Sequence, residues 1–147
     1  MSFFLGRFLE FSAAGLICST LVHILGLFGR RPPFGYFAFS LQFGAVASAI
    51  GAAFAVVQLL SSRGENFWRT AFRRGPRWMK WMTYFLIAYA ILNFIVFVNR
   101  IGHREGLQPD QITALVLRGI SGEWMVFYST ALLIFSSAIR VLDSSEK

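Results

Sequence analysis

Four long apolar runs divide this chain, and most of its charged residues lie between them. The runs cover residues 8–28, 36–60, 79–98 and 123–142. A run of about 18 or more apolar residues is long enough to cross a hydrocarbon core about 30 Å thick as a helix. The sequence therefore predicts an all-α protein. We expect a four-span transmembrane helical bundle that forms a single integral membrane domain over residues 1–147.

The composition supports a membrane location. Hydrophobic residues make up 56% of the chain and charged residues 14%, whereas soluble proteins carry about 25% charged residues. A soluble domain of 147 residues would have to expose much of the four runs on its surface. The net charge of +7 fits basic side chains that face anionic lipid headgroups, so we expect membrane lipids as partners and no nucleic acid.

The basic residues also predict an orientation. With four spans, both termini and the loop between the second and third spans lie on the same side of the membrane. That side carries nine of the 14 Lys and Arg residues. The positive-inside rule then places both termini in the cytoplasm. The compact length and short loops favour a bacterial inner membrane.

The loop between the second and third spans has the pattern of a short basic interfacial helix. Ser62 and Glu65 have the spacing of a capping box, and Gly75-Pro76 ends the pattern. Aromatic side chains share one face, so we expect the rings to point toward the acyl chains and the guanidinium groups toward phosphate. The expected headgroup contacts are Trp68, Arg69, Arg73, Arg74, Arg77 and Trp78. A docking surface for a cytoplasmic partner is the alternative.

The loop before the fourth span is predicted to contain a separate helical segment. Pro109 suits the first turn of a helix, and Asp110 lies favourably near the positive end of that helix. Gly119 and Gly122 then bracket the entry to the fourth span.

Small and polar residues inside the spans mark helix faces that turn toward other helices, because lipid tails are as apolar as leucine. The second span carries two such faces side by side. One face contains Gly44, Ser48, Gly51, Ala55 and Gln58, and the other contains Gln42, Ala45, Ala49 and Ala52. Two faces on one helix predict that this helix is central in the bundle or contacts a second copy of the chain.

Polar residues at similar depth suggest a candidate site. His23, Gln42 and Asn93 each lie about 8–10 Å below the outer boundary at 1.5 Å per residue, and Glu123 heads the fourth span. If the four side chains face inward, they form one polar layer. The layer either holds the helices together by hydrogen bonds or lines a small cavity that binds a polar ligand or relays protons. A third alternative is that the residues do not converge.

The sequence shows no catalytic constellation, so we expect no enzyme activity. It has two histidines and the single cysteine Cys18, which makes a metal or iron–sulfur site unexpected, and haem would require two copies that share their His23 side chains. We expect no cofactor. The first interpretation is a non-enzymatic assembly or accessory component that forms a homo-oligomer or binds another membrane protein. The alternative is a small oligomeric transporter or channel whose site is the polar layer.

Overall fold

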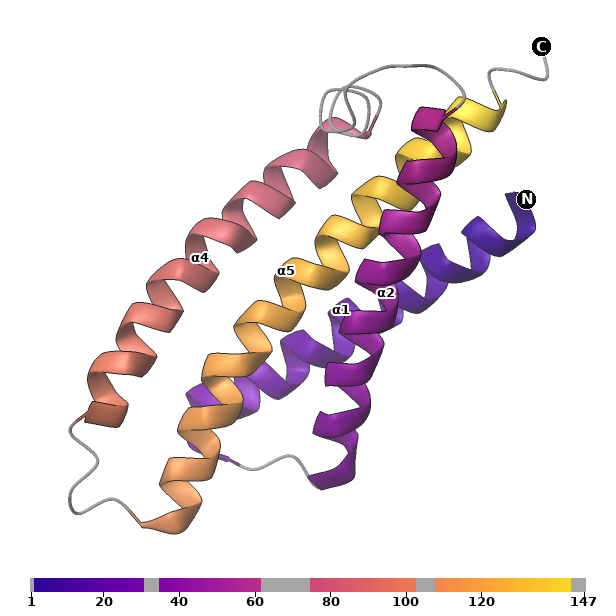
Figure 1. Cartoon of the computed structure of the whole chain (residues 1–147). Helices are drawn as coiled ribbons and strands as arrows, with labels where there is room; N and C mark the ends of the chain where they lie inside the picture. The colour runs from indigo at the N-terminus through magenta and orange to yellow at the C-terminus, as the bar shows by residue number, and fades with distance from the viewer. Residues whose placement is uncertain (1, 31–34, 62–74, 103–107, 144–147) are drawn as a thin grey trace.

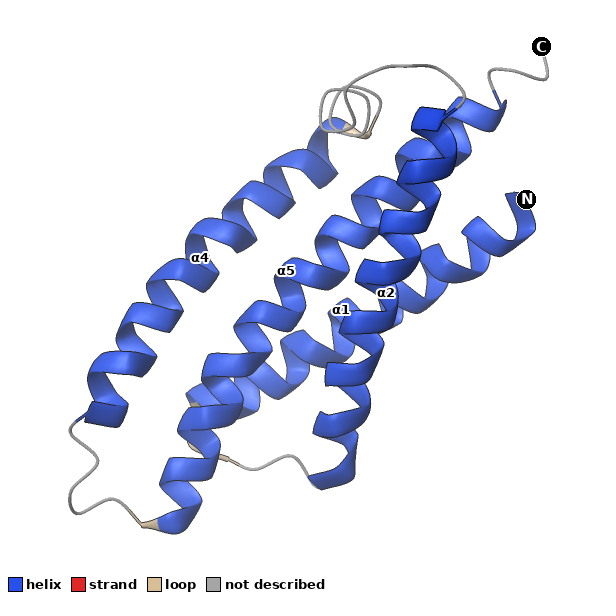
Figure 2. Ribbon diagram, in the orientation of Figure 1, coloured by secondary structure: helices blue, strands red, loops and turns tan. Residues whose placement is uncertain are grey.

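The fold of the chain is described by a computed structural model that covers residues 2–30, 35–61, 75–102 and 108–143. These residues form four helices: α1 (Ser2–Leu27), α2 (Gly35–Ser61), α4 (Arg77–Gly102) and α5 (Pro109–Asp143). Figure 2 shows that the part of the chain described here is helical apart from short connecting stretches and contains no strand. All four helices are long and apolar enough to cross a membrane. The predicted four-span helical bundle is thereby confirmed, and the chain is a membrane protein.

α5 is the axis of the bundle. It packs against α1, α2 and α4, and Figure 1 shows it between α4 and α2. The two chain termini lie at one end of the bundle, which we call the terminal end. α1 and α4 finish at the opposite end, where α2 and α5 begin, and we call it the hairpin end. α2 therefore runs parallel to α5, whereas α1 and α4 run antiparallel to it.

Two basic side chains lie on α5 at a separation close to the thickness of a bilayer core. Arg118 and Arg140 are 22 residues apart on this helix, which corresponds to about 33 Å along its axis. A hydrocarbon core is about 30 Å thick. The segment between these arginines therefore matches one crossing of the bilayer, and the first turns of α5 extend beyond it at the hairpin end.

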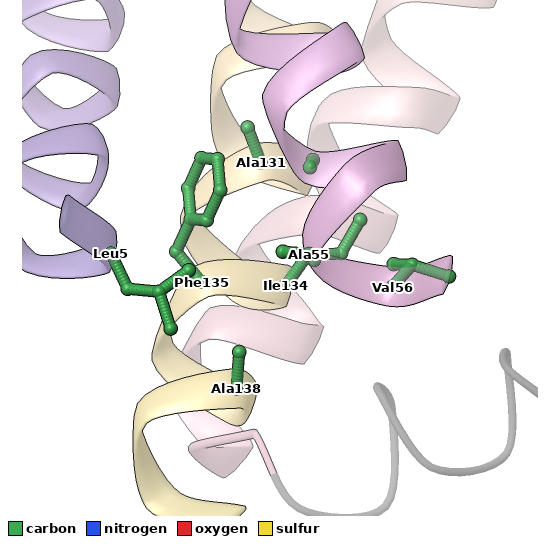
Figure 3. Packing of buried hydrophobic residues seen from close by; sticks show 8 residues of the cluster. Leu5, Ala55, Val56, Ala131, Ile134, Phe135 and Ala138 are labelled. Atoms are coloured by element: carbon green, nitrogen blue, oxygen red, sulfur yellow. The ribbon is translucent and has the colours of Figure 1, made fainter. Parts of the chain in front are cut away.

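The terminal half of the bundle is held by apolar packing. Phe135 is fully buried and stacks on Phe8, with ring centroids 5.5 Å apart. Alanines surround Phe135, so the helix backbones approach closely there. Figure 3 shows this cluster, which comprises Leu5, Ala52, Ala55, Val56, Ala131, Ile134, Phe135 and Ala138.

Tyr128 fills the middle of the bundle. Its hydroxyl donates a hydrogen bond to the carbonyl oxygen of Leu41 at 2.9 Å. A Cβ atom at Gly15 would overlap the ring of Tyr128, and a Cβ atom at Gly44 would overlap its hydroxyl group. Gly15 of α1 and Gly44, which belongs to a predicted packing face of the second span, thus make room for one large side chain from α5.

The structure differs from the sequence interpretation at the start of the fourth span. The segment after Pro109 and the fourth span form one continuous helix, α5. Gly119 and Gly122 lie inside this helix, and each admits a side chain of α4 instead of marking a break. A Cβ atom at Gly119 would lie 2.8 Å from the ring of Phe97. The predicted interfacial helix before α4 falls within residues 62–74, which lie outside the described residues.

Candidate functional site

His23 is the centre of a buried hydrogen-bond network near the hairpin end. Its side chain lies on α1 and is 3% exposed. The imidazole Nδ1 lies 2.9 Å from Ser121 Oγ on α5, and Nε2 lies 2.6 Å from the Tyr89 hydroxyl on α4. One histidine therefore joins three helices.

Ser121 extends this network to the backbone of α5. Its hydroxyl lies 3.2 Å from the carbonyl oxygen of Arg118, a second acceptor besides His23 Nδ1. Which imidazole nitrogen of His23 donates depends on its tautomer. The contacts link Tyr89, His23, Ser121 and a backbone carbonyl.

Asn93 attaches α4 to α5 beside this network. It is 4% exposed, and its Nδ2 donates to the carbonyl oxygen of Arg118 at 3.1 Å. Its Oδ1 accepts a hydrogen bond from Arg118 Nε at 3.2 Å. A Cβ atom at Gly122 would lie 2.9 Å from Asn93 Nδ2 and 4.0 Å from His23 Cε1. The structure thus brings His23 and Asn93 together around Gly122.

Gln42 and Glu123 lie apart from that network. Trp124 Nε1 donates a hydrogen bond to Gln42 Oε1, while most of the Gln42 side chain is exposed. Glu123 is exposed as well, and its carboxylate has no hydrogen-bond or ion-pair partner among the described residues. On α5, Glu123 falls between Gly119, which contacts α4, and Trp124, which contacts α2. We call this exposed surface the Gln42–Glu123 face.

The predicted polar layer is therefore divided into an inner and an outer part at one depth. His23 and Asn93 form the inner part, and the Gln42–Glu123 face forms the outer part. Glu123 is five residues from Arg118, which corresponds to about 8 Å along α5 toward the middle of the bundle. A charge at that depth is costly unless protein or water surrounds it.

The predicted headgroup contacts are placed only in part. Arg77 and Trp78 are exposed at the start of α4, at the terminal end. Trp68, Arg69, Arg73 and Arg74 lie outside the described residues. Within the described ranges, no three His, Cys, Asp or Glu side chains come close enough together to hold a metal ion.

Two residues of the network, Ser121 and Arg118, are not predicted from the sequence, and a third, Tyr89, is not predicted as part of the polar layer. Ser121 and Arg118 precede the predicted start of the fourth span, so they were assigned to a loop. Tyr89 lies one helical turn before Asn93, and this spacing was the available signal that both side chains face the same neighbour.

Comparisons with known proteins add no family to this geometry. No protein-family model, curated protein or solved structure matches the chain. Two features of the structure bear on function: a buried network that joins α1, α4 and α5, and an exposed carboxylate, Glu123, on a candidate membrane span.

Proposed function

We propose that this protein is a non-enzymatic assembly component of a bacterial inner membrane, and that it pairs with a second copy of itself through the Gln42–Glu123 face. The observation that carries the proposal is the Glu123 carboxylate. It is exposed on a helix long and apolar enough to span a membrane, and it has no partner among the described residues. With the boundary of the hydrocarbon core at Arg118, it lies about 8 Å inside the bilayer. Because acidic side chains within spans normally face protein or a water-filled cavity, we expect a protein surface to cover it.

A second copy of the chain can place a hydrogen-bond donor at the same depth in the membrane as Glu123. Two copies in the same orientation, related by a twofold axis along the membrane normal, keep each residue at its own depth. Gln42 and Glu123 share a depth because Gln42 accepts a hydrogen bond from Trp124, the neighbour of Glu123. Gln42 uses its Oε1 in that bond, and its Nε2 hydrogens remain available for the Glu123 carboxylate of the second copy. Symmetry then gives this bond twice.

The surface of α2 next to this face permits close approach. Ala49 is half-buried and Ala53 is exposed, and both lie on the same side of the helix as Gln42. Small residues allow helix backbones to come close together in a bilayer. Of the second small-residue face of α2, Ala45 and Ala52 are buried inside the bundle, so Gln42 and Ala49 are the members left to contact a second copy.

The inner network supports a packing role. Every buried side-chain nitrogen and oxygen of the described residues has a hydrogen-bond partner. The contacts of His23 join α1 to α4 through Tyr89 and to α5 through Ser121. This complete pairing of buried polar groups supports a role in helix attachment.

We place both termini and the terminal end in the cytoplasm, because nine of the 14 basic residues belong to that side. Arg30→Cys and Arg140→Cys, each in a Cys18→Ser background, test this orientation with a membrane-impermeant maleimide applied to intact spheroplasts. Labelling at position 30 and protection at position 140 are expected. The reverse pattern would contradict the proposed orientation.

Native mass spectrometry in mild detergent tests the pairing. We expect a dimer for the unmodified chain, and an increase in the dissociation constant of about tenfold or more for Glu123→Ala, because two hydrogen bonds are lost per dimer. Glu10→Ala is the matched control, since Glu10 is an exposed carboxylate on α1 that is already paired with Arg7.

Cross-linking then tests the geometry. In a Cys18→Ser background, a mixture of Gln42→Cys and Glu123→Cys chains should form a disulfide between the two variants. A strict monomer, or a dimer that Glu123→Ala leaves unchanged, would refute self-pairing. Recovery of a different membrane protein bound at Glu123 would retain the assembly role and reject the second copy as the occupant.

A further inference from the structure

A pocket of about 420 Å³ opens at the hairpin end, where α1 and α4 finish and α5 begins. Its walls come from Gly26, Leu27 and Gly29 at the end of α1, Arg100 of α4, and Gln111, Ala114, Leu115 and Arg118 of α5. Sites for small molecules typically have volumes of about 300–1,000 Å³. This pocket is therefore large enough for a small polar group, and it is separate from the Gln42–Glu123 face.

The charge of the pocket is positive. Arg100 and Arg118 contribute two guanidinium groups from two helices, and none of the lining residues is acidic. Neither arginine has an ion-pair partner among the described residues. A guanidinium group carries five N–H donors, and Arg118 uses only its Nε in the bond to Asn93. The terminal nitrogens of both arginines remain available to an anion.

Arg118 is held in place before any ligand binds. Asn93 accepts from Arg118 Nε at 3.2 Å and donates to the Arg118 carbonyl oxygen at 3.1 Å. α1 closes the other side, because a Cβ atom at Gly26 would lie 3.0 Å from Arg118 Cβ. A side chain fixed in this way loses little conformational entropy on binding.

We propose that this pocket binds a phosphoryl group, with Arg100 and Arg118 as its principal ligands and Gln111 as an additional donor. The planar fork of a guanidinium group matches two oxygens of a phosphate. Arg118 marks the end of the membrane-spanning part of α5, so the pocket lies at the depth of lipid phosphates. The phosphoryl group can therefore belong to a phospholipid headgroup or to a soluble phosphate monoester.

Binding measurements on the full chain in a neutral detergent distinguish the two sources. The probes are short-chain phosphatidylglycerol, glycerol 3-phosphate, and a monoacylglycerol that lacks phosphate. A lipid site gives tight binding of phosphatidylglycerol and weak binding of glycerol 3-phosphate, whereas a site for soluble ligands binds glycerol 3-phosphate equally well. Failure of both phosphate-bearing probes to bind, or equal binding of the monoacylglycerol, would overturn the proposal.

Substitutions locate the binding to the pocket. The Arg100→Gln/Arg118→Gln double variant should weaken binding of the preferred phosphate probe at least tenfold. Arg118→Lys should weaken it less, because the charge remains while the fork is lost. Arg30→Gln is the matched control, since Arg30 is an exposed arginine that follows α1 and is not among the pocket lining residues.

Two outcomes of this series count against the site. Undiminished binding by the double variant would show that the phosphate is held elsewhere, and an equal loss for Arg30→Gln would indicate general attraction to a basic surface. Thermal unfolding of each variant in the same detergent is measured without probe. If Arg118→Gln lowers stability, Arg100→Gln alone decides the result, because Arg100 is exposed at the end of α4.

Discussion

The helices are held together by different kinds of contact in the two halves of the bundle. In the terminal half, α1, α2 and α5 meet through apolar side chains around Phe135. In the hairpin half, a second apolar cluster around Trp124 and Tyr128 joins α1, α2 and α5, and the hydrogen bonds of His23 and Asn93 attach α4 to it. Lipid does not drive helices together as water does. Close packing therefore holds the helices where small residues permit it, and directional bonds fix α4, which buries only Thr83 and Asn93.

The largest effect is expected in the terminal half. Phe135→Ala should lower the free energy of unfolding by about 3 kcal/mol, because the alanine leaves a cavity in the cluster around a fully buried ring. Unfolding by dodecyl sulfate in mixed micelles measures the change. Phe54→Ala is the control, since Phe54 is on α2 and its side chain is 67% exposed. An equal decrease in the free energy of unfolding for the two variants would contradict the conclusion that apolar packing around Phe135 stabilises this half.

A smaller effect is expected in the hairpin half. His23→Ala removes both hydrogen bonds of the imidazole and should cost about 1–2 kcal/mol in the same unfolding measurement. Tyr89→Phe removes only the bond to His23 Nε2. A double-mutant cycle between the two substitutions should give a coupling energy of about 0.6 kcal/mol, the average for such bonds in membranes. Zero coupling would show that the hydrogen bond between His23 and Tyr89 does not stabilise the hairpin half.

The smallest effect is expected outside both packed regions. Arg7 and Glu10 form an ion pair at 2.9 Å on the surface of α1, and both side chains are exposed. Arg7→Gln should leave the free energy of unfolding within about 0.5 kcal/mol of the unmodified chain. A larger loss would mean that charged contacts at the terminal end contribute to the packing of that half.

The sequence was a good guide to the spans and a partial guide to the site. Hydropathy located the four helices, and Pro109 marked the start of α5. Helical depth placed His23 and Asn93 at the same level, and they share one network. The partners Ser121 and Arg118 were missed because glycines and an arginine lower the hydropathy of that segment. In the structure, Gly122 makes room for Asn93, and Arg118 marks the end of the membrane-spanning part.

The identity of the central helix could not be deduced from hydropathy. Lipid and protein interiors are similarly apolar, so the composition of a helix does not reveal how many neighbours surround it. The two small-residue faces of α2 suggested a central position, whereas α5 buries Trp124, Tyr128 and Phe135 against its neighbours. Whether Glu123 faces inward could not be deduced for the same reason, because its exposure depends on which faces of α5 contact α2 and α4.

The position of α5 has a consequence for biogenesis. α5 is the last of the four spans to leave the ribosome, and it supplies most of the surface on which the others pack. Until it enters the bilayer, α4 has few protein neighbours and the imidazole of His23 has no serine to bind. The first three spans therefore reach their packed arrangement only after α5 has entered the bilayer.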